Sequence, residues 1–201
     1  MAEIATRTNH TTDATNYTSI ATNYIDQWTT LAMSNDSISP FPAGTTDTSS
    51  PSLPHTTLNY NNASTYSLLY NLYTDKELSL SLIPDQIYTQ QSSFYPTVNL
   101  NYGVPLDTRH NYTKADWQMF CAAIASAETR DMFVDDVAKW LAQTGTDLPF
   151  SDLYETVTGE FVEGTVFDAR PVVGGMFALL ALPNATQSAS VGERVESGLM
   201  D

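Results

Sequence analysis

The sequence predicts an all-α protein, because apolar residues recur at helical spacing along most of the chain and strand-like patterning is confined to one short segment. Residues 13–33 illustrate the pattern, since Tyr17, Tyr24, Trp28 and other apolar positions follow one another at intervals of three and four. This spacing is typical of an amphipathic helix that buries an aromatic stripe. With 201 residues and 42% hydrophobic residues, the chain is long enough for one domain with a real core.

Five further helices are expected, joined by long and uneven connections, which favours a fold built from helical hairpins. They are predicted at residues 64–80, at residues 84–95, after a capping box at residues 113–116, after a cap at Thr129, and at residues 171–182. Residues 34–64 and 99–112 are predicted to be loops, residues 153–168 a short β-hairpin turning near Gly159, and residues 183–201 a disordered tail. The Gly174-Gly175 pair lowers helix propensity, so tight packing against a neighbour is the expected reason for it.

Charge and composition exclude several classes of function. The 23 acidic residues outnumber the 8 Lys and Arg residues and give a net charge of −15, which repels nucleic acids and anionic membrane surfaces. The three histidines lack metal-ligand spacing, and neither a metal nor another cofactor is predicted. Cys121 is the only cysteine, so it forms no internal disulfide and is expected to be a buried structural thiol.

The glycosylation sequons point to an extracellular protein. Six Asn-x-Ser/Thr sequons occur, at Asn9, Asn16, Asn35, Asn62, Asn111 and Asn184, where chance predicts about 2.7. The first residues nevertheless lack the pattern of a signal peptide. We therefore expect that the full-length protein is secreted and that this chain lacks its own beginning.

The loop at residues 102–110 is the first candidate for chemistry. It places Asp107, Arg109 and His110 within four positions, ahead of a helix. The guanidinium of Arg109 suits a substrate carboxylate, and Asp107 suits an ammonium group or the role of a base. A structural interpretation stays open, in which an Asp–Arg pair holds the loop and the histidine lies at the surface.

Further candidates follow along the chain. Asp116 is either a catalytic acid or the last member of the capping box. Asp152 and Tyr154 offer a carboxylate and a phenol at a helix-to-hairpin junction, although Asp152 also suits a turn. Arg170, just before the last helix, either neutralises one of these acids or binds the anionic end of a substrate.

Four stretches together resemble the six-hairpin toroid domain of fungal-type extracellular glutaminases, the glutaminase A family. They are residues 92–98, residues 102–110 continuing into 113–117, residues 150–156 and residues 169–175. The resemblance covers residues 1–182 and implies an (α/α)6 toroid of which this chain holds the last three hairpins. It also implies hydrolysis of L-glutamine to L-glutamate and ammonia outside the cell, with the missing N-terminal portion of the same polypeptide as partner.

The resemblance implies a set of site residues without assigning a nucleophile. Asp107, His110, Asp116 and Asp152 are expected as catalytic residues, and Arg109, Tyr154 and Arg170 as substrate-binding residues. Within this set, we expect Arg109 to bind the glutamine carboxylate, Asp107 its ammonium group, and Asp116 or Asp152 to transfer protons. Two alternatives are a toroid glycoside hydrolase with paired carboxylates and a non-catalytic helical module. We also expect the isolated chain to be inactive, because a toroid site draws residues from hairpins on both sides.

Overall fold

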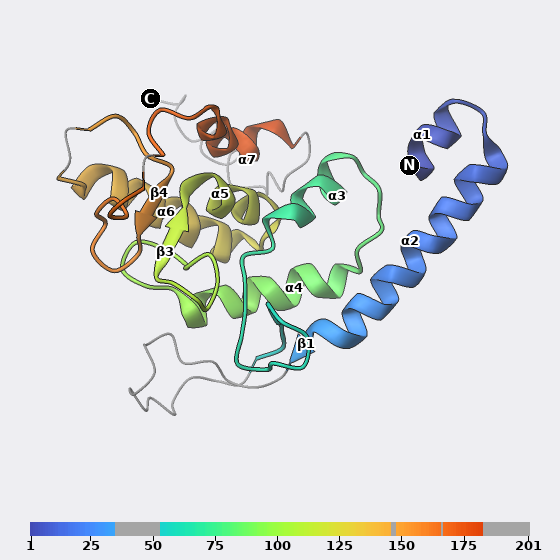
Figure 1. Cartoon of the computed structure of the whole chain (residues 1–201), viewed down its shortest axis with the longest axis horizontal. Coiled ribbons are helices and arrows are strands. Elements are labelled where there is room, and N and C mark those ends of the chain that lie inside the picture. Colours follow the sequence, from blue (N-terminus) through green and yellow to red (C-terminus); the bar gives the residue numbers. More distant parts are fainter. Residues whose placement is uncertain (35–52, 146–147, 166, 183–201) are drawn as a thin grey trace, which may run out of the picture.

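The computed structural model describes residues 1–34, 53–145, 148–165 and 167–182, and it is mostly helical (Figure 1). Two small antiparallel sheets accompany the helices. The prediction of an all-α fold with a short β insertion is thus confirmed. The tail predicted at residues 183–201 and most of the loop predicted at residues 34–64 lie outside the described residues.

The chain begins with α1 (Ala2–Arg7) and α2 (Thr11–Ala32), the long helix expected from the apolar spacing. Figure 1 shows α2 projecting beyond the rest of the chain, with α1 folded back on its far end. The aromatic stripe is not buried, since Tyr17, Ile20 and Tyr24 are exposed and only the end near Trp28 packs on the core. The expectation of a buried stripe was wrong because periodicity identifies the apolar side of a helix but not whether the chain supplies a partner for it.

The helix predicted at residues 64–80 is mostly absent. It is replaced by a 3₁₀ turn, η1 (Tyr70–Leu72), and the short α3 (Tyr73–Glu77). The backbone just before η1 pairs with a distant segment instead of forming helical hydrogen bonds, since the Leu68 amide donates to the Leu106 carbonyl at 2.8 Å. The expected apolar positions Leu68, Leu69, Leu72 and Tyr73 are nevertheless buried.

The next helix, α4 (Asp85–Phe94), continues into a 3₁₀ turn, η2 (Tyr95–Val98). Pro84 is the residue before the helix rather than part of its first turn, and Pro96 lies within η2 rather than stopping the helix. Pro96 fits at the start of η2 because the first residues of a helical turn need no intrahelical amide donor.

The helices α5 (Ala115–Ile124) and α6 (Ala127–Gln143) pack on each other. The capping box expected at residues 113–116 is wrong: Lys114 precedes α5, and the hydroxyl of Thr113 has no partner. The cap of α6 is Ser126, whose hydroxyl accepts from the Thr129 amide, rather than Thr129 itself.

The predicted β-hairpin is partly realised. The strand β3 (Tyr112–Lys114) pairs antiparallel with β4 (Leu153–Glu155), while β1 (Met33–Ser34) pairs with β2 (His55–Thr56). After β4 the chain turns at Gly159, which has a φ of 77°, and an isolated bridge joins Tyr154 to Phe161. The last segment starts at Pro171 as expected, but its first seven residues form a 3₁₀ helix, η3 (Pro171–Phe177), before α7 (Ala178–Ala181).

The helix α5 organises the structure, because η1, α3, α6, η3 and α7 all pack against it. Its residues contribute to several apolar clusters of the described chain, among them one with Phe94, Val98 and Phe133 and another with Val137 and Trp140. The starts of η1 and α5 meet where the rings of Tyr70 and Trp117 stack at 3.7 Å. The starts of these two segments thus lie together, beside Lys114 of the candidate site.

Candidate functional site

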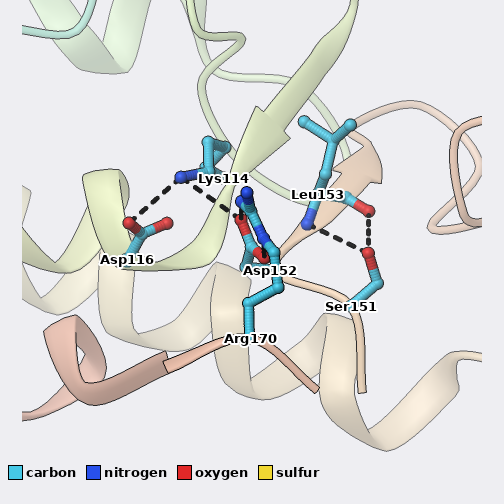
Figure 2. A network of polar contacts seen from close by, with 6 residues as sticks. All are labelled: Lys114, Asp116, Ser151, Asp152, Leu153 and Arg170. Carbon is cyan, nitrogen blue, oxygen red and sulfur yellow. Dashed lines mark hydrogen bonds and ion pairs between the residues drawn. The ribbon is translucent and has the colours of Figure 1, made fainter. Parts of the chain in front are cut away.

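Four charged side chains meet between the start of α5, the start of β4 and the start of η3 (Figure 2). Lys114 Nζ lies 3.2 Å from an oxygen of Asp116 and 3.2 Å from an oxygen of Asp152. Arg170 binds Asp152 through both carboxylate oxygens, at 2.8 Å from Nε and 2.5 Å from Nη2. We call Lys114, Asp116, Asp152 and Arg170 the charged quartet.

Local structure explains why these side chains converge. The Ala115 amide donates to the Asp152 carbonyl at 2.9 Å, which ties the start of α5 to the residue before β4. The Ala169 amide donates to the Phe150 carbonyl at 2.7 Å, which brings the residue before Arg170 to the same segment. These two bonds join segments that lie far apart in the sequence.

The acids of the quartet are buried and the bases are more accessible. The side chains of Asp116 and Asp152 are 4% and 2% exposed, whereas those of Lys114 and Arg170 are 12% and 32% exposed. A buried carboxylate is costly unless it is paired, so both acids depend on the two bases. A ligand in solvent would meet the guanidinium and ammonium groups first.

The pKa values of the two acids are shifted in opposite directions. Burial alone would raise the pKa of Asp152, but the hydrogen bonds from Arg170 and the charge of Lys114 hold this pKa below its ordinary value. Burial raises the pKa of Asp116, and the single contact with Lys114 offsets this only in part. Oδ1 of Asp116 is buried and has no hydrogen-bond partner among the described residues. The quartet thus combines a fixed anion, Asp152, with an acid that retains its proton to higher pH, Asp116.

An aromatic ring lies against each of the two bases of the quartet. The Lys114 ammonium lies 5.2 Å from the centroid of the Trp117 ring, and the Arg170 guanidinium 3.9 Å from that of Phe167. Cations over aromatic faces are stabilised by the ring quadrupole. These contacts restrict both bases to the side of the site on which the acids lie.

The Asp107 and Arg109 side chains form a separate pair in the loop before β3. Arg109 donates to both carboxylate oxygens of Asp107, at 2.9 and 2.6 Å, and its amide donates to Oδ1 at 2.8 Å. Burial alone would raise the pKa of Asp107, but these hydrogen bonds lower it below its ordinary value. The Arg109 side chain is 67% exposed, and His110 stacks on Tyr112 at 4.7 Å. Among the contacts of the described residues, none joins this pair to the quartet.

Tyr154 lies in the core rather than at the quartet. It is fully buried, its ring stacks on Trp140 at 3.8 Å, and its hydroxyl donates to the Tyr102 carbonyl and accepts from Gln118. Burial raises the pKa of Tyr154 well above its ordinary value. Its hydroxyl is therefore committed to internal hydrogen bonds, and no part of the ring is open to a ligand.

Comparison with known proteins identifies the family. The family model described as the glutaminase A six helical-hairpin domain matches residues 1–180. The chain belongs to the glutaminase A family. It is 50% identical to a protein named glutaminase A from Aspergillus oryzae over 182 aligned residues. This alignment covers 90% of this chain and 24% of that protein. It is also 37% identical over 158 residues to a probable glutaminase from Arthroderma benhamiae, covering 65% of this chain and 18% of the relative. No solved structure is a significant match.

The glutaminase A family assignment confirms the resemblance found in the sequence and agrees with the helical-hairpin fold. The chain spans about a quarter or less of the length of these relatives. Within the described part of the chain, no group of three or more His, Cys, Asp and Glu residues is placed to hold a metal ion, and no helix is long and apolar enough to cross a membrane.

Lys114 is the member of the quartet that sequence reasoning missed. Its sequence position, two residues before Asp116, suggested only a capping box. The available signal was proximity in the sequence, because a lysine two residues before a buried acid is a natural partner for it. Lys114 ends β3 and Asp116 already lies in α5, so neither a strand nor a helix period predicts that the two side chains meet.

Proposed function

We propose that this chain contributes the charged quartet to the active site of a secreted glutaminase, which hydrolyses L-glutamine to L-glutamate and ammonia. The names of the two relatives support the reaction, and the quartet supplies groups suited to it. The observation that carries the proposal is the pair of buried acids, Asp116 and Asp152, which share Lys114 as a basic partner and whose pKa values are shifted in opposite directions.

In this proposal Asp116 transfers the proton. Hydrolysis adds water to the side-chain amide carbon and breaks the carbon–nitrogen bond, and the departing nitrogen must receive a proton. An acid whose pKa is raised by burial holds its proton to a higher pH than an exposed aspartate, so it can donate that proton to the departing nitrogen and take one back from the attacking water. Asp152, whose two oxygens are both bound, orients Lys114 and Arg170 instead.

The bases bind the substrate. Arg170 uses Nε and Nη2 for Asp152, and Lys114 uses two contacts for the acids, which leaves N–H donors on both side chains. We assign these donors to the substrate carboxylate and to the carbonyl oxygen, on which negative charge develops during attack. We retain three residues as proposed substrate contacts at the outer rim of the site: Asp107, Arg109 and His110. Tyr154 is left out of the site because it is fully buried.

The rest of the six-hairpin domain completes the site in this proposal. Both ends of the chain carry exposed apolar side chains on helical surfaces, with Ile20 and Tyr24 on α2, Phe177 at the end of η3 and Leu180 on α7. Such surfaces are typical of interfaces. We infer that further hairpins of the same polypeptide cover them, and that the isolated chain is inactive because part of the catalytic constellation and its protection from water are missing.

A chimera tests the function directly. Residues 1–182 of this chain would replace the matching 24% of the Aspergillus oryzae glutaminase A. We expect the chimera to release ammonia from L-glutamine and the isolated 201-residue chain to release none above background. Equal rates for the two proteins would contradict the proposed dependence on the remaining hairpins, and a folded but inactive chimera would contradict the function.

Glycoside hydrolysis is the second candidate, favoured by one observation. Asp116 and Asp152 each have an oxygen 3.2 Å from the same Lys114 ammonium, so the two carboxylates lie close enough to flank a glycosidic bond, for which separations of about 5–10 Å are used. Assay of the same chimera on aryl glycosides separates the two functions. We expect no release of the aryl group.

A further inference from the structure

Gly175 lies directly against the Asp116 side chain. A Cβ atom added at Gly175 would stand 2.8 Å from Cβ of Asp116 and 3.0 Å from the nearest atom of the Phe120 ring. Non-bonded carbon atoms pack at about 3.5–4.0 Å, so no other residue fits here without movement. The neighbouring Gly174 has no atom within 4 Å of the corresponding position. The two adjacent glycines therefore differ. Gly174 faces open space, whereas Gly175 is in close contact with Asp116 of the quartet.

The contact has a consequence for the carboxyl group. Because Gly175 lacks a side chain, the backbone of η3 approaches α5 closely at the position where Asp116 lies. The Asp116 side chain is only 4% exposed, and its Oδ1 atom is buried with no hydrogen-bond partner among the described residues. The close approach of η3 to Cβ of Asp116 is one of the contacts that bury this side chain.

We propose that Gly175 is a positioning residue for Asp116, which lets η3 lie against the Asp116 side chain and keeps water from its carboxyl group. As a role in catalysis, this inference rests on the proposed function of the quartet. As a structural device it is independent of that function, since it concerns only the surroundings of one carboxyl group.

The direction of the effect follows from the groups that face Asp116. They are Lys114 from β3, Asp152 from the segment before β4 and Arg170 from the start of η3. Cβ of Asp116 is fixed by the backbone of α5, so a methyl group at Gly175 displaces η3 rather than the acid. Outward movement of η3 admits water, and rotation of the carboxyl group toward Lys114 strengthens their ion pair. Both relaxations favour the ionised form and lower the pKa of Asp116. The same movement carries Arg170 away, but this opposing effect is smaller because Lys114, at 3.2 Å, is the cation in contact with Asp116.

Carboxyl titration by ¹³C NMR of the 201-residue chain measures this pKa without any assay of activity. The resonance of Asp116 is assigned by its loss in Asp116→Asn. We expect a lower pKa for Asp116 in Gly175→Ala than in the unchanged chain, and an unchanged pKa in Gly174→Ala, the matched control. An unchanged or higher pKa in Gly175→Ala, or equal shifts in both variants, would overturn the proposal.

A second variant covers the case in which Gly175→Ala fails to fold. In the background of Phe120→Leu, the added methyl group has more room on the ring side but still meets Cβ of Asp116. Gly175→Ala is then compared with the Phe120→Leu protein alone, and the same fall in the pKa of Asp116 is expected. No difference between these two proteins would refute the positioning role.

The chimera described above separates this inference from the proposed function. If both hold, the limb of the pH–rate profile that depends on Asp116 moves to lower pH in Gly175→Ala and stays in place in Gly174→Ala. A shift by NMR with an unmoved pH–rate profile keeps the positioning role and refutes the catalytic role of Asp116. Full activity of Asp116→Asn refutes that catalytic role whatever the NMR shows.

Discussion

Replacing Lys114 by methionine tests whether the quartet holds its acids as the structure implies. Methionine keeps much of the length and the apolar stem of lysine, so packing on Trp117 is largely preserved while the charge is removed. Asp152 retains both hydrogen bonds from Arg170. Lys114 is the one side chain among the described residues that hydrogen-bonds Asp116, so its loss leaves a buried carboxyl group with neither oxygen bound to another side chain.

The free energy of unfolding lost in Lys114→Met is limited by the free energy needed to protonate Asp116. A buried unpaired carboxylate takes up a proton, and holding an aspartate with an unfolded-state pKa of about 3.9 protonated at pH 7 costs about 4 kcal/mol. At pH 5 the same cost is only about 1.5 kcal/mol. These values are upper limits, because the pKa of Asp116 is already raised in the unchanged protein.

The sign of the pH dependence follows from linkage. The folded pKa of Asp116 lies above its unfolded value, so the folded state binds the proton more tightly and stability increases as the pH falls through the folded pKa. Removing Lys114 raises that pKa further. The destabilisation caused by Lys114→Met should therefore be large at pH 7 and smaller at pH 5.

Urea denaturation of the 201-residue chain at both pH values measures this effect. Lys76→Met is the matched control, because Lys76 pairs with Asp85 at 2.8 Å on the surface and the Asp85 side chain is 91% exposed. We expect little change for this control at either pH. Similar losses of stability for the two variants, or a loss for Lys114→Met that does not shrink at pH 5, would refute this account of the quartet.

Three further predictions concern other parts of the chain. Tyr154→Phe should lower the free energy of unfolding in urea by about 1–3 kcal/mol, because it leaves the buried side-chain amide of Gln118 without its acceptor. The same change should leave KM of the chimera unchanged, and a raised KM would restore Tyr154 to the substrate site. Burial raises the pKa of Asp136 to about 6, so stability should increase as the pH falls through 6, and Asp136→Asn should reduce this dependence; an unchanged slope would place its source elsewhere. Asn62 and Asn111 are both exposed, so secretion from a fungal host should attach glycans there, visible as a mass loss on deglycosylation; an unchanged mass would count against secretion.

The core and the helix-forming segments were predictable because they depend on local spacing. The buried positions Phe133, Val137 and Trp140 follow the expected three- and four-residue intervals along α6. Residues 64–80 have a similar apolar pattern, yet most of them are not helical. Their amides bind groups distant in the sequence, as in the bond from the Leu69 amide to the Tyr95 hydroxyl at 3.0 Å. Local pattern carries no information about such competing partners.

The candidate site was predictable as a set of residues but not as a geometry. Asp116, Asp152 and Arg170 do meet, and of the two roles left open for Arg170 the structure shows the neutralisation of an acid. Sequence reasoning gave no means to distinguish the two acids, because the pKa of Asp152 depends on hydrogen bonds from Arg170, 18 positions away, and the pKa of Asp116 depends mainly on its burial in the folded chain. The expected convergence of the Asp107–Arg109 loop on the same acids stays a prediction, since the described contacts do not join them.

The central claim is that Asp116 transfers a proton in amide hydrolysis, and steady-state ammonia release from L-glutamine by the chimera tests it most directly. Asp116→Asn keeps the shape of the side chain but removes the acid, whereas Asp131→Asn makes the same change at an exposed carboxylate on α6. We predict that kcat falls by about 100-fold or more for Asp116→Asn and is unchanged for Asp131→Asn, with both proteins folded. A kcat for Asp116→Asn equal to that of the Asp131→Asn control would contradict the claim.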